Sequence, residues 1–167
     1  MTTRTMADHL AAHEHLFDIY ATWSAGFTAD DLATQSLCPD WDVRGVIAHA
    51  LGVETVLDGW TPSTETPPPF EMMGDFATRL ADLAPDALAA AVAEVTTSRL
   101  EHLRSLDPAV VDAPSITPTG AKTYGDFLRI RVFDLWVHAR DIAIPLGRPL
   151  DAGGIAAELA LDEVAGA

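Results

Sequence analysis

Apolar residues recur every three or four positions along several stretches of this chain, which is the spacing of amphipathic helices. The first stretch covers residues 6–26 and is predicted to form a helix that ends near Gly26. Its apolar face is predicted to consist of Leu10, Phe17, Ile19, Tyr20 and Trp23.

A second helix is expected within residues 36–60. Pro39 ends any earlier helix, and either Asp40 or Asp42 can cap the new one. The apolar face of this helix is predicted to comprise Val43, Val46, Ile47, Ala50, Val53 and Leu57. Residues 61–70 are rich in proline, so we expect them to end the helix and to run over the surface as a loop.

Apolar periodicity predicts two further helices, over residues 71–83 and 86–106. Residues 107–123 are interpreted as a loop with a short extended piece at Val110–Val111.

Thr123 and Asp126 have the spacing of a capping box, which opens a helix that continues through about Ile144. A last helical stretch is expected from near Gly154. Four main helices and two substantial loops predict an all-α fold, a helical bundle with at least one long crossover connection.

Composition narrows the class of protein. The 167 residues are 49% hydrophobic and 21% charged, which is typical of a globular chain, and the length suits about one domain. A net charge of -15 and a pI near 4.4 argue against nucleic acid or an anionic membrane as partners. Cys38 is the only cysteine, and no segment resembles a signal peptide or a transmembrane helix. A cytoplasmic location is therefore expected.

The segment "FDLWVHARDI", residues 133–142, places Asp134, His138 and Asp141 within a largely apolar helix. Side chains four positions apart lie close enough on a helix to bind one ion. His49 lies between Val46 and Val53 on or beside the apolar face of the second helix, so it could supply a third ligand. Two histidines and a carboxylate leave coordination positions open, but a hydrogen-bonded Asp–His pair would equally satisfy these groups.

Two longer segments, "CPDWDVRGVIAHALG" and "RVFDLWVHARDI", together resemble the DinB-like helical bundles and, more narrowly, the mycothiol-dependent maleylpyruvate isomerase family of actinobacteria. The resemblance rests on Trp41, Val43, Arg44 and His49 in the first segment and on Arg131, Asp134, His138 and Asp141 in the second. It implies a DinB-like four-helix bundle with long crossover loops. It also implies a divalent metal ion, with zinc expected, held by His49, Asp134 and His138.

Two features depart from the family's pattern. The family usually has glutamate where this chain has Asp134, so either the helices approach more closely or metal coordination is weakened or lost. Many members also have a further C-terminal domain, whereas this chain stops at Ala167. We therefore expect one metal-binding helical domain over residues 1–167.

The resemblance further implies mycothiol as the thiol cosubstrate of a transferase or isomerase that acts on a small electrophile. Asp141 is expected to orient an imidazole, and Arg131 to pair with Asp134 or with a substrate carboxylate, a buried salt bridge being equally compatible. A non-catalytic binding protein and a metal-dependent hydrolase stay as alternatives. The oligomeric state is open, with a homodimer among the options.

Other polar and aromatic residues are given structural interpretations. Cys38 is expected to pack as a small apolar residue where the second helix begins, although a helix N-terminus there could lower its pKa. His9 and His13 are four positions apart and could chelate a metal ion, but no third ligand is evident, so they are expected on a solvated face. The four tryptophans are expected to pack in the core or against loops, and Trp136 to face away from the proposed ligands.

Overall fold

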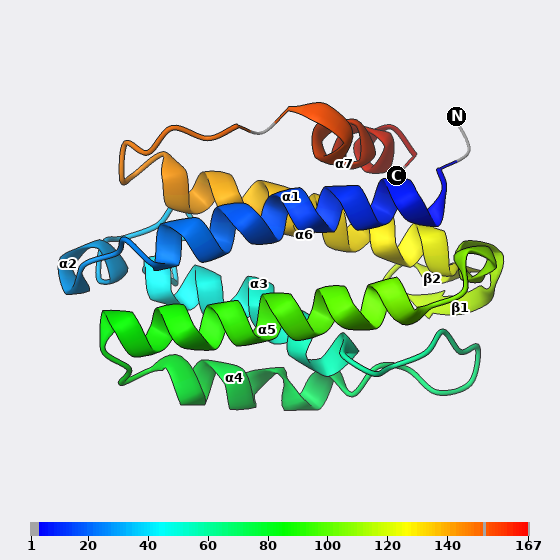
Figure 1. Ribbon diagram of the computed structural model, residues 1–167, viewed down its shortest axis with the longest axis horizontal. Helices are drawn as coiled ribbons and strands as arrows, with labels where there is room; N and C mark the ends of the chain where they lie inside the picture. Colours follow the sequence, from blue (N-terminus) through cyan, green and yellow to red (C-terminus); the bar gives the residue numbers. More distant parts are fainter. Residues whose placement is uncertain (1–3, 152, 167) are drawn as a thin grey trace.

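Four long helices form the body of the molecule in the computed structural model, which describes residues 4–151 and 153–166. They are α1 (Met6–Ser24), α3 (Val43–Leu57), α5 (Pro85–Ser105) and α6 (Tyr124–Ala143) (Figure 1). Helix α1 packs against α5 and α6, and α3 packs against the same two helices. Helices α1 and α3 therefore occupy opposite corners of the bundle, and both the α1–α3 and the α5–α6 connections cross it. The predicted all-α bundle with a long crossover is confirmed.

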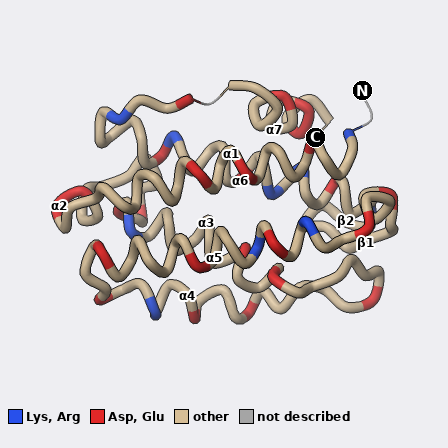
Figure 2. Tube along the Cα trace, in the orientation of Figure 1, with Lys and Arg blue, Asp and Glu red and all other residues tan. Residues whose placement is uncertain are grey.

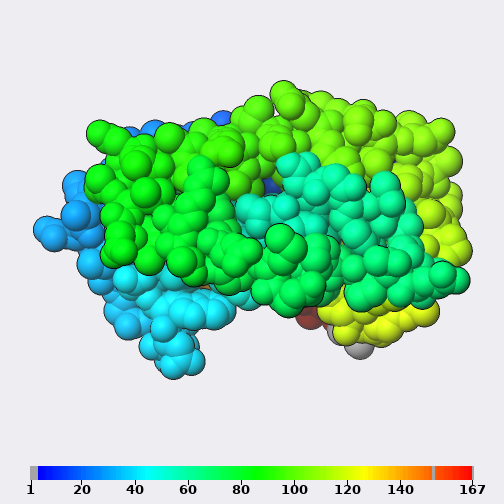
Figure 3. Space-filling view, turned by 90° about the horizontal axis from the view of Figure 1, so that it is seen from below, coloured from blue at the N-terminus to red at the C-terminus, as the bar shows by residue number. Residues whose placement is uncertain are grey.

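Shorter elements occupy the connections and the outer faces. Helix α2 (Ala29–Leu32) lies in the first crossover, and the 3-10 helix η1 (Phe70–Met72) leads into α4 (Met73–Leu80). Helix α4 packs on the outside of α3, on the face shown in Figure 3, and α7 (Gly154–Gly166) packs on α1 and α6.

The second crossover contains a β-hairpin that was not predicted, and the extended piece expected at Val110–Val111 is wrong. Val110–Val111 lie in a 3-10 helix, η2 (Pro108–Asp112), and not in an extended piece. The strands β1 (Pro114–Thr117) and β2 (Gly120–Thr123) follow and pair antiparallel. Asp107 caps η2 by accepting a hydrogen bond from the Ala109 amide, so two β-branched residues are held in a turn that their propensity does not predict.

Local signals explain where the helices begin. The side chain of Asp42 accepts a hydrogen bond from the Gly45 amide, so Asp42, and not Asp40, caps α3. Thr123 and Asp126 form the expected capping box at the start of α6. Arg44 donates hydrogen bonds to the carbonyls of Leu80, the last residue of α4, and of Leu83 just beyond it, which gives this residue of the family motif a structural role.

Charged residues are distributed along all the long helices and the loops (Figure 2). The acidic residues gather in no single part of the described chain in this view. Among the described helices, none is long and apolar enough to cross a membrane.

His9 and His13 were expected to face solvent, and this expectation is wrong. Only 2% of His9 and 0% of His13 is exposed, because the buried face of α1 is offset from the predicted one. This face comprises Met6, His9, Ala12, His13, Leu16, Phe17, Tyr20, Trp23 and Ser24. The Nδ1 of His13 donates to the carbonyl of His9, and its ring meets Phe17 edge to face. Polar residues within an apolar stripe are thus part of the core.

Lowering the pH should destabilise this protein at pH values above those at which most carboxylates become protonated. Burial lowers the pKa of both His9 and His13 from 6.5 to about 4, so the unfolded chain binds more protons between these two values. Their contribution to stability is complete above the unfolded pKa and is lost as pH falls toward the folded one. We expect a loss on the order of 3 kcal/mol per histidine between pH 7 and pH 4, measured by urea unfolding.

The control for this prediction is the double variant His9→Leu and His13→Leu. Without the two imidazoles, the free energy of unfolding should fall much less between pH 7 and pH 5. An unchanged slope in the double variant would assign the acid sensitivity to other groups.

Candidate metal centre

Residues on α3 and α6 meet at one edge of the bundle. The Asp42 cap sets the first turn of α3, and His49 follows it by two turns. On α6, Asp134 and His138 are four residues apart and point to the same side, toward His49. The spacing along α6 predicted this pairing, and the packing of α3 against α6 brings in the third residue.

The three proposed ligands converge. One potential ligand atom from each of His49, Asp134 and His138 lies within 4.8 Å of the other two. Asp134 Oδ1 is 3.9 Å from His49 Nε2 and 3.6 Å from His138 Nε2. Bonds of about 2.0–2.2 Å to a tetrahedral zinc ion would place neighbouring ligand atoms roughly 3.3–3.5 Å apart. The two distances from Asp134 exceed this range by only a few tenths of an ångström, so the shorter Asp134 side chain still reaches both histidines.

The charge at Asp134 suits a cation. Burial would raise the pKa of this carboxyl, but its interaction with the neighbouring His49 imidazole and the positive charge of Arg131 outweigh burial. The net effect holds the pKa of Asp134 well below its usual range, so the group is a carboxylate at neutral pH. About a quarter of the Asp134 side chain and 30% of the His49 side chain are exposed, so solvent or a small ligand reaches the ligand atoms.

Asp141 orients the second histidine of the set. His138 Nδ1 lies 2.8 Å from Asp141 Oδ2, an arrangement in which the Nδ1 proton is donated to the carboxylate. The Nε2 lone pair then faces Asp134 and His49. Such a hydrogen bond to the outer nitrogen is the usual support of a metal-binding histidine. The expected position of Asp141 beside His138 is present, and its catalytic role stays a prediction.

Arg131 lies behind Asp134 and is 5% exposed. Its Nη1 donates to Asp134 Oδ2 at 3.1 Å, Nε donates to Glu54 Oε1 at 2.9 Å, and Nη2 donates to the carbonyl of Ala50 at 3.2 Å. All three nitrogens of the guanidinium group thus donate hydrogen bonds within the protein. This geometry favours orientation of Asp134 over contact with a substrate carboxylate, and the assignment of Arg131 as catalytic stays a prediction.

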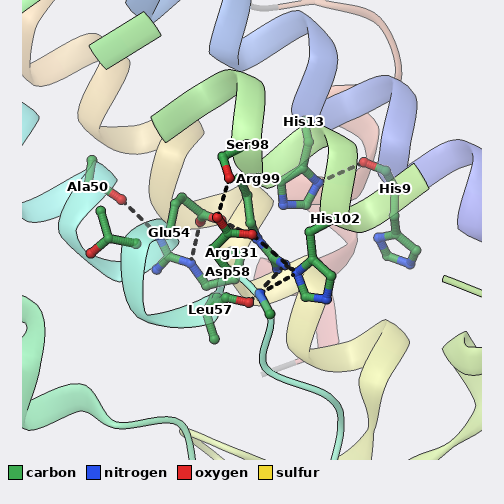
Figure 4. A network of polar contacts seen from close by, with 12 residues as sticks. His9, His13, Ala50, Glu54, Leu57, Asp58, Ser98, Arg99, His102 and Arg131 are labelled. Carbon is green, nitrogen blue, oxygen red and sulfur yellow. Dashed lines mark hydrogen bonds and ion pairs between the residues drawn. The ribbon is translucent and has the colours of Figure 1, made fainter. Parts of the chain in front are cut away.

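A buried charge network extends from the site into the core (Figure 4). Glu54, which is 0% exposed, accepts from Arg131 on one oxygen and from Arg99 Nε on the other at 3.0 Å. Arg99 also donates to the carbonyl of Leu57 and to His102 Nδ1. The two guanidinium charges outweigh burial and keep the pKa of Glu54 low. This network was not predicted from the sequence. Glu54 is an isolated charged residue on an apolar helix, and its partners are far away in the sequence.

Trp41 contacts the candidate site, which was not predicted from the sequence. It does not pack in the core: it is 37% exposed and stacks on the imidazole of His49, with ring centroids 4.6 Å apart. A β-carbon at Gly45 would lie 3.0 Å from Trp41 Cβ, a tight contact that glycine at this position avoids. The spacing of Trp41, Gly45 and His49 at successive fourth positions was the available signal.

Cys38 also lies at this site. The thiol is partly buried against the core, as expected, but it also donates to Asp141 Oδ2 at 3.2 Å. Helix α3 begins only at Val43, so no helix N-terminus acts on the sulfur. Burial, together with Asp141, raises the pKa of Cys38 to about 11, which is opposite to the lowering considered from the sequence. Trp136 packs partly buried against the core, with Arg140 over its ring.

Comparison with known proteins identifies the family. Residues 7–143 match the family described as the mycothiol maleylpyruvate isomerase N-terminal domain. The chain belongs to this family. Uncharacterized proteins from two strains of Mycobacterium tuberculosis are each 27% identical to it over 160 residues, which is 96% of this chain and 78% of theirs.

Two solved structures share the fold of this member of the family. They are crystal structures of a mycothiol-dependent maleylpyruvate isomerase and of a histidine-to-alanine mutant of it. Each matches with a TM-score of 0.72 and 19% sequence identity, over 99% of this chain and 71% of the other. The expected DinB-like bundle is thereby supported.

Proposed function

We propose that this protein is a metal-dependent, thiol-using isomerase or transferase that acts on a small electrophilic substrate, with mycothiol as the thiol. The observation that carries the proposal is the convergence of His49, Asp134 and His138 at a partly exposed edge of the bundle. Membership of the mycothiol maleylpyruvate isomerase family supports the choice of thiol and of reaction class.

Residues of the chain would have two kinds of role, metal binding and orientation of the metal ligands. His49, Asp134 and His138 would hold a divalent ion, with zinc expected for this donor set. When bound, such an ion supplies a Lewis acid that favours the thiolate form of a thiol at an open position. Asp141 keeps the Nε2 lone pair of His138 directed at the site, and Arg131 holds the second oxygen of Asp134.

The reaction that we propose begins with addition of the thiol to an electrophilic double bond. Rotation about the resulting single bond and loss of the thiol would return the double bond with the opposite geometry, which is isomerisation. Retention of the adduct would instead be S-transfer. Trp41 covers His49 from the loop side, and its exposed portion lies beside the site where the substrate would approach.

The first test is metal content together with thiol chemistry, on protein purified without a nickel column. We expect close to one equivalent of metal per chain and consumption of mycothiol in the presence of an activated electrophile. Adding metal at about 100 times its Kd should stabilise the folded state by about 2.7 kcal/mol, which raises the melting temperature by roughly 5–10 °C. A chelator should remove both the stabilisation and the activity.

Two results would contradict the proposal in different ways. An unmoved melting curve after chelation of metal-loaded protein would exclude a metal site of useful affinity. Metal binding without thiol consumption for any activated electrophile would favour a non-catalytic binding protein with the same fold.

A further inference from the structure

A second group of potential ligands lies on the other edge of the His138 ring. Cys38 Sγ is 3.2 Å from Asp141 Oδ2 and 3.9 Å from His138 Nδ1, and these last two atoms are 2.8 Å apart. The three atoms lie within 4.8 Å of one another, as do those of the first group. This group uses Nδ1 of the imidazole, whereas the candidate centre described above uses Nε2.

The loop before α3 holds the sulfur in place. The Cys38 amide donates to Ser36 Oγ at 3.0 Å, and Ser36 Oγ donates to the carbonyl of Trp41 at 2.6 Å. The Leu37 amide donates to the backbone carbonyl of Asp141 at 3.2 Å, which fastens the loop directly to α6. These hydrogen bonds thus hold the Cys38 backbone beside the two α6 residues.

The donor types point to a particular class of ion. A thiolate, an imidazole nitrogen and a carboxylate oxygen form a zinc-type ligand set, and the sulfur selects soft, thiophilic ions. With bonds of about 2.3 Å to sulfur and about 2.0 Å to nitrogen and oxygen, the ligand atoms would be roughly 3.3–3.6 Å apart. The present separations of 2.8–3.9 Å bracket this range. An ion here would replace the two hydrogen bonds that now converge on Asp141 Oδ2.

We propose that Cys38, Asp141 and His138 Nδ1 form a second cation site for a thiophilic ion such as Cd²⁺ or Zn²⁺, and that an ion bound there excludes one from the first site. Binding requires the thiol proton to pass to solvent and the ring proton to move from Nδ1 to Nε2. A neutral imidazole has only one free lone pair, so His138 serves one site at a time. A thiophilic ion would therefore leave the first site with two ligands and disable it.

The test is a Cd²⁺ titration of the purified full chain, followed by the ultraviolet charge-transfer absorption of a thiolate–Cd²⁺ bond. The wild type and His49→Ala should develop this band, because His49 belongs only to the first site. Cys38→Ser should lack it, and Asp141→Asn should need at least about 10-fold more Cd²⁺ to reach it. Circular dichroism of each variant without metal checks that the fold is retained. The readout is metal binding alone, so it is independent of the proposed activity.

Clear outcomes would overturn the proposal. Absence of the band in the wild type would exclude the site. Equal Cd²⁺ affinity in the wild type, Asp141→Asn and His138→Ala would show that the thiol binds the ion without its neighbours. Two tightly bound Cd²⁺ ions per wild-type chain would refute the mutual exclusion that the shared imidazole requires.

Discussion

Glu54→Gln is expected to destabilise the fold by about 3–5 kcal/mol, the usual cost of removing one partner from a buried ion pair. Glu54 is completely buried and lies between Arg99 and Arg131, each at hydrogen-bond distance. Glutamine keeps the size of the side chain but removes its charge and turns an NH₂ group toward one of the guanidinium groups. Arg131 would then keep only the partly exposed Asp134 as a carboxylate partner, and Arg99 would have none among the described residues. The free energy of unfolding from urea denaturation measures the effect.

Glu94→Gln is the matched control for this experiment. Glu94 also pairs with an arginine, Arg79, but 63% of its side chain is exposed. Surface ion pairs contribute little, so we expect a change within about 0.5 kcal/mol. A loss below about 1 kcal/mol for Glu54→Gln would show that water or rearrangement compensates the two arginines.

Removal of a proposed metal ligand is expected to have the largest effect on function. His49→Ala and His138→Ala each leave two ligands, so metal affinity should fall by more than the roughly 10–100-fold that loss of a supporting group costs. Thiol consumption should be lost with the metal. Isothermal titration with Zn²⁺ and analysis of bound metal measure the first effect, and an assay of free thiol measures the second. Equal activity in the wild type and both variants would remove the metal from catalysis.

Substitutions at Asp134 should form a graded series. Asp134→Glu introduces the residue usual in the family and should bind metal better than Asp134→Ala. Asp134→Asn should lie between these two, because it keeps an oxygen ligand but loses the charge that favours a cation. In each variant Arg131 loses or changes a partner, so stability without metal must be measured alongside affinity. The reverse order, with alanine retaining more metal than glutamate, would argue against Asp134 as a ligand.

Helix positions followed from local information in the sequence. Apolar periodicity located α1, α3, α5 and α6, and caps such as Asp42 and the Thr123–Asp126 box set where two of them begin. These signals depend on residues a few positions apart, which is why they are readable without the fold. Helix α2 and the β-hairpin were missed because elements of four residues are too short to show a repeated apolar pattern.

The same distinction explains the candidate site. Asp134, His138 and Asp141 lie on one helix, so their spacing along the chain was enough to predict that they are neighbours. His49 could be proposed from its place on an apolar face, but only the packing of α3 against α6 puts it within reach of Asp134.

Contacts between distant segments were decided by the tertiary structure alone. Glu54 meets Arg99 and Arg131 across 45 and 77 residues, and Cys38 meets Asp141 across 103. The burial of His9 and His13 likewise depends on which side of α1 the neighbouring helices cover. Periodicity reports that a helix has an apolar face, but a polar residue at the edge of that face is buried or exposed according to the helices packed beside it. That choice is made by the free energy of the whole bundle, which tolerates the burial of His9 Nδ1 and His13 Nε2 without a hydrogen-bond partner within the described residues.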